Sequence, residues 1–96
     1  MKHVLSTRKL IETFKGEIAL FLKFIGKAVP RTPVAEVTMA QFDDPYWEPL
    51  INWRGRMLGM ERMLLLNGVT AAELSQLKKD AGLPEAFRNL RPHGDA

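Results

Sequence analysis

The residues that come nearest to a chemical site are three carboxylates between positions 43 and 48. Asp43, Asp44 and Glu48 offer the oxygen ligands that Ca²⁺ and Mg²⁺ take in proteins. Their spacing matches no cation-binding loop, however, and they precede a segment with helical periodicity. Acidic side chains at the start of a helix are stabilised by the helix dipole. We therefore interpret the cluster as a helix start, with Asp44 as its cap, and predict no metal site.

The other residue types provide no catalytic set. His3 and His93 are the two histidines, and both lie near the ends of the sequence, where we expect least order. Neither is therefore a good candidate for a general base. The chain has no cysteine, which excludes disulfides, a thiolate nucleophile and cysteine-ligated metals. Motifs of serine hydrolases, zinc peptidases, P-loop proteins and dinucleotide-binding proteins are also absent. We predict a non-enzymatic protein without a cofactor.

The most informative feature is the amount of apolar surface on residues 10–29. A helix that faces the core of a small domain needs only one apolar stripe. Here the stripe is widened by Ile11, Leu22 and Val29 on one side and by Leu20 and Phe24 on the other. The surplus predicts contact with a second copy of the chain or with another protein. The central stripe consists of Leu10, Phe14, Ile18, Phe21 and Ile25.

A second helical segment, at residues 44–67, repeats this excess. Its methionines fit either an irregular core or an adaptable binding surface. Arg54 falls on the apolar side and needs an acidic partner, for which Glu12 and Glu17 are the candidates. We expect one apolar stripe to face the core and the two stripes together to reach an interface. The core stripe is Leu50, Trp53, Met57, Met60 and Leu64, and the second, at heptad spacing, is Ile51, Leu58 and Leu65.

Capping patterns and prolines divide the chain into four helices within one domain, residues 1–96. The first helix begins at Ser6 or Thr7 and ends near position 28, and a proline-bounded connector follows at 29–38. The connector carries a weak extended pattern at 34–37, and a helical turn is expected from position 39. The second long helix begins at position 44, or only near 48 because of Pro49, and ends at 67–68.

Two shorter helices are expected at about 71–81 and 85–90. The first of them has a capping box formed by Thr70 and Glu73, and Lys78 and Lys79 suit its negative end. Residues 1–5 and 91–96 are expected to be flexible tails. The predicted fold class is all-α, a small helical bundle of two long antiparallel helices and two short C-terminal helices.

The formal net charge of +3 is unevenly distributed. Residues 1–33 are mainly basic, residues 34–53 contain acidic but no basic side chains, and residues 54–96 are mixed. This pattern allows the acidic middle to lie against the basic start, and it differs from the uniform basicity of a chain devoted to phosphate. Glu12, Glu17 and Lys23 interrupt the first apolar run. We therefore expect neither a signal peptide nor a membrane span, and predict a cytoplasmic protein.

Surplus apolar surface without a catalytic set predicts a small regulatory or inhibitory protein that binds another protein. It also predicts a homodimer, because a two-fold interface is the simplest way to cover the surface. The sequence does not identify the partner. Aromatic residues are frequent anchors of interfaces, although they are also common in small cores. The predicted interface residues are Phe21, Phe24 and Ile25, followed by Trp47, Trp53 and Met60.

The alternative prediction is a small DNA-binding transcriptional regulator. Residues 64–90 resemble a helix-turn-helix. The match is poor, because Leu64 stands where close helix crossing favours a small residue and Asn67 where an apolar residue is usual. A second alignment, with its turn at 82–84, leaves only a short reading helix before Pro92. The predicted DNA contacts are Ser75, Gln76, Lys79 and Arg88.

Overall fold

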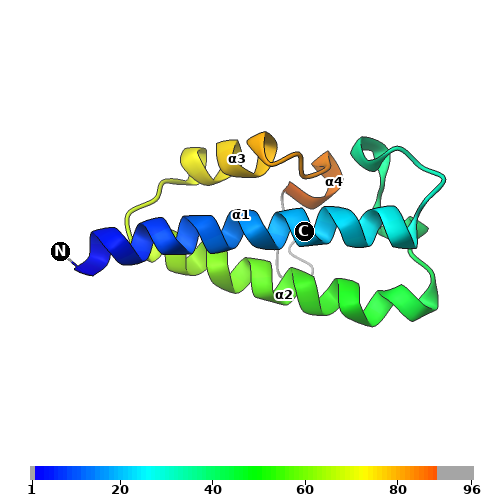
Figure 1. The fold of residues 1–96 in the computed structure, drawn as a ribbon, viewed down its shortest axis with the longest axis horizontal. Coiled ribbons are helices and arrows are strands. Elements are labelled where there is room, and N and C mark those ends of the chain that lie inside the picture. The colour runs from blue at the N-terminus through cyan, green and yellow to red at the C-terminus, as the bar shows by residue number, and fades with distance from the viewer. Residues whose placement is uncertain (1, 89–96) are drawn as a thin grey trace.

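A computed structural model describes residues 2–88, with side chains from residue 7 onward. All regular secondary structure in the described part is helical, which confirms the all-α fold class. Figure 1 shows four α-helices, and the connector between the first two contains two 3₁₀ turns. The α-helices are α1 (Lys2–Ala28), α2 (Asp44–Leu66), α3 (Ala71–Asp80) and α4 (Glu85–Arg88), and the 3₁₀ turns are Val34–Glu36 and Met39–Gln41.

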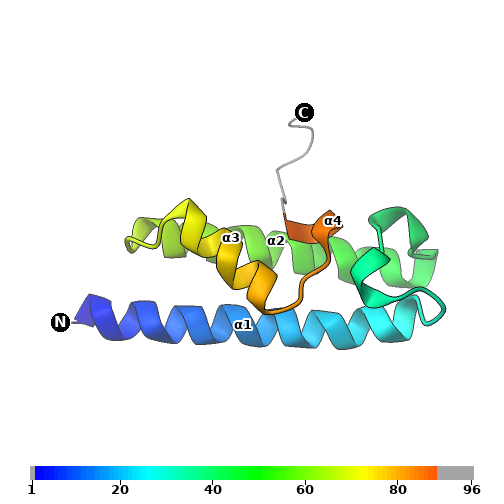
Figure 2. The same ribbon diagram turned by 90° about the horizontal axis from the view of Figure 1, so that it is seen from above.

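The two long helices lie side by side and run in opposite directions (Figure 1). Pro30 and Pro33 end α1, and the connector then turns the chain around at one end of the molecule. Seen from above, α3 crosses over the seam between α1 and α2, and α4 continues on the same side (Figure 2). The short helices therefore cover one side of the α1–α2 pair.

The core lies along the seam between α1 and α2. Phe21 of α1 stacks on Trp53 of α2, with ring centroids 3.5 Å apart and an interplanar angle of 6°. Phe87 of α4 meets Phe21 edge-on at 5.1 Å, which ties the last helix to the same cluster. Both predicted core stripes are confirmed, since only Leu10 and Met60 among their members are half-buried rather than buried. The buried members are Phe14, Ile18, Phe21 and Ile25 of α1 and Leu50, Trp53, Met57 and Leu64 of α2.

Local signals set the ends of α2 and α3 as expected. Gly68 follows α2 with φ +95°, and Gly82 follows α3 with φ +85°, the left-handed conformation that glycine adopts without strain. The capping box at α3 is complete. The backbone N–H of Glu73 donates to the Thr70 hydroxyl at 3.1 Å, and the Thr70 N–H donates to the Glu73 carboxylate at 2.8 Å. The capping box between Thr38 and Gln41 is also present.

Three expected boundaries differ from the structure. The backbone of α1 begins at Lys2 rather than at Ser6 or Thr7, because no proline or glycine in the first turns prevents its extension. Residues 34–36 form a 3₁₀ turn instead of an extended segment. The Glu36 N–H donates to the Pro33 carbonyl at 2.8 Å, and no described strand lies beside the segment to pair with it.

The start of α2 also differs from the expectation. The cap is Asp43, one position earlier than the expected Asp44, and Asp44 is the first residue of the helix. The helix begins before Glu48, the later of the two expected starts. Pro45 lies in the first turn, where no intrahelical donor is needed, and Pro49 is tolerated inside the helix at the loss of one backbone hydrogen bond.

A buried ion pair fixes α3 to α2. The Lys78 side chain is 8% exposed, and its Nζ donates to Glu61 Oε2 at 3.2 Å and to the backbone carbonyl of Arg88. In the sequence, Lys78 is recognisable only as a charge near the negative end of the α3 dipole. Three helices therefore meet at one ammonium group, and this contact was not anticipated.

Candidate interaction surfaces

The structure divides the six predicted interface residues between the core and the surface. Phe21, Ile25 and Trp53 are at most 3% exposed, so in this fold they contact other parts of the same chain. Phe24 and Met60 are half-buried. Trp47 is 44% exposed. Of the six, therefore, only Phe24, Met60 and Trp47 are accessible from outside the chain.

The surplus apolar surface of α1 has two different outcomes. On one side Val29 is buried, Ile11 and Leu22 are half-buried, and α3 lies nearby. On the other side Leu20 is 60% exposed and Phe24 is half-buried. Part of the surplus predicted from the sequence is therefore covered within the chain, and the part around Leu20 is not.

The uncovered side contains a groove between α1 and α2 with a cavity of about 240 Å³. Phe21 and Trp53 form a stacked aromatic floor beneath it. Phe24 is held in place by rings on two sides, with its centroid 5.9 Å from that of Phe21 and 5.8 Å from that of Tyr46. We call this the α1–α2 groove, and it is lined by Glu17, Leu20, Phe21, Phe24, Pro49, Trp53 and Arg56.

An ion pair lies at the rim of this groove. Arg56 donates to Glu17 Oε1 at 3.5 Å, and the two side chains are 56% and 24% exposed. An exposed pair at this distance contributes little to stability. Glu17, one of the two predicted partners of Arg54, pairs with Arg56. The groove thus combines a rigid apolar floor with one accessible cationic group.

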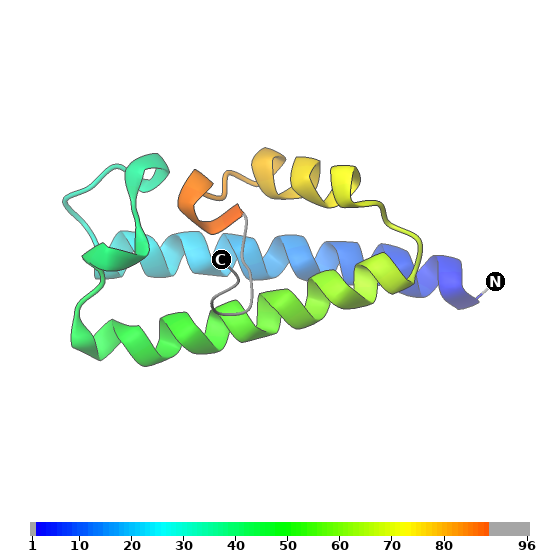
Figure 3. The ribbon, with the colours of Figure 1, turned by 180° about the vertical axis from the view of Figure 1, so that it is seen from behind.

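A second uncovered surface runs along α2. No described element lies on the side of this helix that faces away from α1 and α3 (Figures 1 and 3). The heptad stripe predicted from the sequence lies on this side, with Ile51 40% and Leu65 47% exposed and Leu58 half-buried. Most of the large exposed hydrophobic residues of the described chain belong to this helix, and the other one is Leu20 of α1. Those on α2 are Trp47, Ile51, Met63, Leu65 and Leu66.

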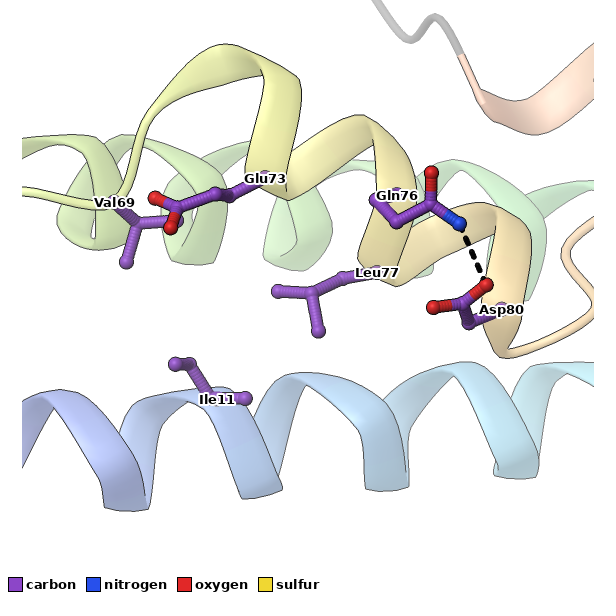
Figure 4. A pocket seen from close by; sticks show the side chains of 6 residues that line it. All are labelled: Ile11, Val69, Glu73, Gln76, Leu77 and Asp80. Atoms are coloured by element: carbon purple, nitrogen blue, oxygen red, sulfur yellow. Dashed lines mark hydrogen bonds between the residues drawn. The ribbon is translucent and has the colours of Figure 1, made fainter.

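A further pocket, of about 280 Å³, lies between α1 and α3 (Figure 4). Ile11 and Leu77 point toward one another across it. Its polar side chains already form hydrogen bonds within α3 and its N-terminal cap. Glu73 completes the capping box, and Gln76 Nε2 donates to Asp80 Oδ1 at 2.7 Å. Because these groups are engaged locally and do not converge on a common point, we interpret the pocket as a gap in packing.

The residues of the DNA-binding alternative share no protruding helix. Ser75, Gln76 and Lys79 are exposed on α3, which lies flat over the two long helices (Figure 2). Arg88 is half-buried on α4, where its Nε donates to the Leu83 carbonyl at 2.9 Å. A reading helix must enter the major groove. The orientation of α3 does not favour this alternative.

The acidic cluster lies at the start of α2 as expected, although Asp43 and not Asp44 is the residue before the helix. Asp43, Asp44 and Glu48 are exposed around the first turns of α2. Across the described residues, no group of three or more acidic, histidine or cysteine side chains is placed to hold a metal ion. Among the described helices, none combines the length and the apolar character needed to cross a membrane. His93 lies outside the described residues, and the side chain of His3 is not described.

Comparisons with protein families, with characterised proteins and with solved structures find no match for this chain. Arguments about function therefore rest on the surfaces described above. The sequence predicts Phe24, Trp47 and Met60 as interface residues and Leu20 as part of the surplus, and the structure leaves these four side chains at least partly accessible. The sequence did not identify Arg56 or Pro49, because their place beside the aromatic floor depends on how α1 and α2 are rotated against each other.

Proposed function

We propose that the protein is a small non-enzymatic regulator or inhibitor that binds another protein in the α1–α2 groove. The observation that carries the proposal is the exposure of Leu20, at 60%, beside a preformed aromatic floor. Leaving a large apolar side chain in water forgoes the free energy of its burial, about 1.5–3 kcal/mol for a residue of this type. A partner that covers Leu20 recovers this free energy.

The groove fits an anchor side chain on a partner helix. A cavity of about 240 Å³ has room for one leucine, methionine or phenylalanine side chain. Its floor is rigid because Phe21 and Trp53 are stacked and buried, so little order is lost on binding. Arg56 is exposed and only weakly engaged by Glu17, so it can donate hydrogen bonds to a carboxylate of the partner beside the anchor. The expected partner segment is therefore an apolar and acidic helix.

We also propose that the chain forms a homodimer. The apolar stripe of α2 is separate from the groove and is uncovered in one copy of the chain. Burial between two copies would remove this stripe from water in the same way that α1 covers the inner stripe.

The proposal is tested by affinity capture from extracts of the source cells, followed by binding measurements with the purified partner. Leu20→Glu places a charge at the mouth of the groove. Its matched control is Ala19→Glu, an exposed neighbour that points about 100° away around the helix. Both variants should keep the helical circular dichroism of the wild type, since neither position is buried.

We expect the wild type and Ala19→Glu to bind the same protein with equal affinity. Leu20→Glu should weaken binding by about 30-fold or more, because an anchor at the centre of an interface contributes at least ~2 kcal/mol. Equal binding by the two folded variants would contradict the proposed site. A wild type that captures no protein would contradict the function.

A further inference from the structure

The surface of α2 that faces away from α1 has a composition that its own chain does not explain. Six residues follow one another along it at helical spacing, and we call this set the α2 outer face. Trp47, Ile51 and Leu65 are 40–47% exposed, and Leu58 is half-buried. The two remaining members, Gly55 and Gly59, are one turn apart. The α2 outer face is thus Trp47, Ile51, Gly55, Leu58, Gly59 and Leu65.

The two glycines serve no contact within the chain. A Cβ atom added at Gly55 or Gly59 would meet nothing within 4 Å. Glycine in the middle of a helix is less favourable than alanine, and here no neighbouring backbone of the same chain requires it. Between apolar side chains, two glycines one turn apart leave a shallow depression that another helix can approach closely.

The exposed charges of α2 change sign along its length. Asp44 and Glu48 precede Gly55 and Arg62 follows it, and all three are exposed. Arg56 belongs to the α1–α2 groove, where it pairs with Glu17, and Glu61 is neutralised by Lys78. A parallel copy of α2 would place like charges together. An antiparallel copy places the acidic start of each helix beside Arg62 of the other.

We propose that a second copy of the chain packs on the α2 outer face, with the two α2 helices antiparallel and the two-fold axis close to Gly55. Glu48 and Arg62 are each seven positions from Gly55, so this axis brings Glu48 of one copy opposite Arg62 of the other, twice. Ile51 and Gly59 are each four positions away. The isoleucine of each copy therefore faces the depression left by the glycine of the other.

The inference rests on the proposed homodimer, for which it supplies the contact, and it uses a different surface from the α1–α2 groove. The first test is sedimentation velocity of the full chain over a range of micromolar concentrations. The expected mass is twice the chain mass of 10.9 kDa. Glu48→Arg and Arg62→Glu should each weaken the dimer about tenfold, because each turns two symmetric attractions into repulsions. The double variant, in which both pairs are re-formed with reversed sign, should return toward the wild-type dissociation constant.

Arg56→Glu is the matched control, because it reverses an exposed arginine of the same helix that faces Glu17 rather than the α2 outer face. It should leave dimerisation unchanged. A monomeric wild type would overturn the inference, and so would a double variant as weak as the single ones. Capture of a partner in the α1–α2 groove by a monomeric chain would overturn the dimer alone and leave the proposed binding of another protein in the groove in place.

The orientation is tested by a single spin label. The chain has no cysteine, so Asp44→Cys provides one label per copy at an exposed position of α2. In the antiparallel dimer, position 44 of one copy lies 22 residues along the helix axis from position 44 of the other. This corresponds to about 33 Å between the two Cα atoms. In a parallel dimer they lie about 10 Å apart. Double electron–electron resonance measures the distance between the two labels. A distance near the longer value supports the proposed axis, and one near the shorter value overturns it.

Discussion

The two faces of α2 are both apolar, yet only one of them is a core. On the inner face Leu50, Trp53, Met57 and Leu64 are at most 3% exposed. On the outer face Ile51 retains 40% of its exposed surface. The residue types overlap, so hydrophobicity alone does not separate the two faces. What separates them is the presence of a partner surface, because α1 covers the inner face and no described element covers the outer one.

Side-chain size also distinguishes the two faces. The inner face holds Trp53, whose ring stacks on Phe21 of α1 at 3.5 Å. The outer face holds Gly55 and Gly59, which have open space around them. Large side chains fill the gap between two helices of the same chain, whereas small ones leave room for a helix that is not part of it. The comparison implies that substitutions on the two faces act on different properties, stability on the inner face and association on the outer one.

The largest expected effect is on the inner face. Trp53→Ala removes one half of the Phe21–Trp53 stack and leaves a cavity in the core, so we expect a loss of about 3–5 kcal/mol in the free energy of unfolding. Ile51→Ala should change this free energy by no more than about 0.5 kcal/mol. Urea unfolding at a concentration low enough for the monomer measures both. Equal losses would show that the outer face is also packed within the chain.

An intermediate effect is expected where α2 meets α3. Lys78→Ala leaves the carboxylate of Glu61, whose side chain is 14% exposed, without its partner. We expect a loss of about 2–3 kcal/mol, below the range for a fully buried pair because Glu61 reaches some solvent. The control is Lys79→Ala, an exposed neighbour that should change stability by less than about 0.5 kcal/mol. Identical unfolding midpoints for these two variants would contradict the role of the ion pair.

The smallest changes in the free energy of unfolding are expected from glycine substitutions, and their sign differs between two positions. Gly59→Ala should stabilise the monomer by up to about 1 kcal/mol, because the position is open and helical. Gly82→Ala should destabilise it by about 1 kcal/mol, since φ is +85° there. Thermal unfolding resolves such changes as shifts of about 4–8 °C for a domain of this size. Destabilisation of the monomer by Gly59→Ala would mean that the outer face has a partner within the chain.

Signals confined to a few residues predicted the fold well. The capping box of Thr70 and Glu73 and the stop at Gly68 are set by neighbouring residues, so the sequence alone identified them. The start of α2 was less certain, because three acidic residues and two prolines offer several starts of similar free energy. The helical spacing of the core stripes in α1 and α2 was also sufficient to identify their buried members.

The interaction surfaces could not be predicted to the same extent. Phe21, Ile25 and Trp53 satisfied every compositional requirement of an interface, yet they lie in the core because α1 and α2 place them against each other. Leu20 lies next to Phe21 in sequence and remains exposed. The difference depends on the rotation of α1, which long-range packing determines. For the same reason the ion pair between Glu61 and Lys78 was not found from sequence spacing.

The central claim is that the uncovered apolar surface of the long helices binds protein. The most direct test replaces Leu20 with the photo-reactive residue p-benzoylphenylalanine in the source cells, with the same replacement at Ala19 as the control. We predict that irradiation joins position 20 to a specific second polypeptide and that position 19 gives no such product. Absence of a cross-linked product from position 20, or the same products from both positions, would contradict the account.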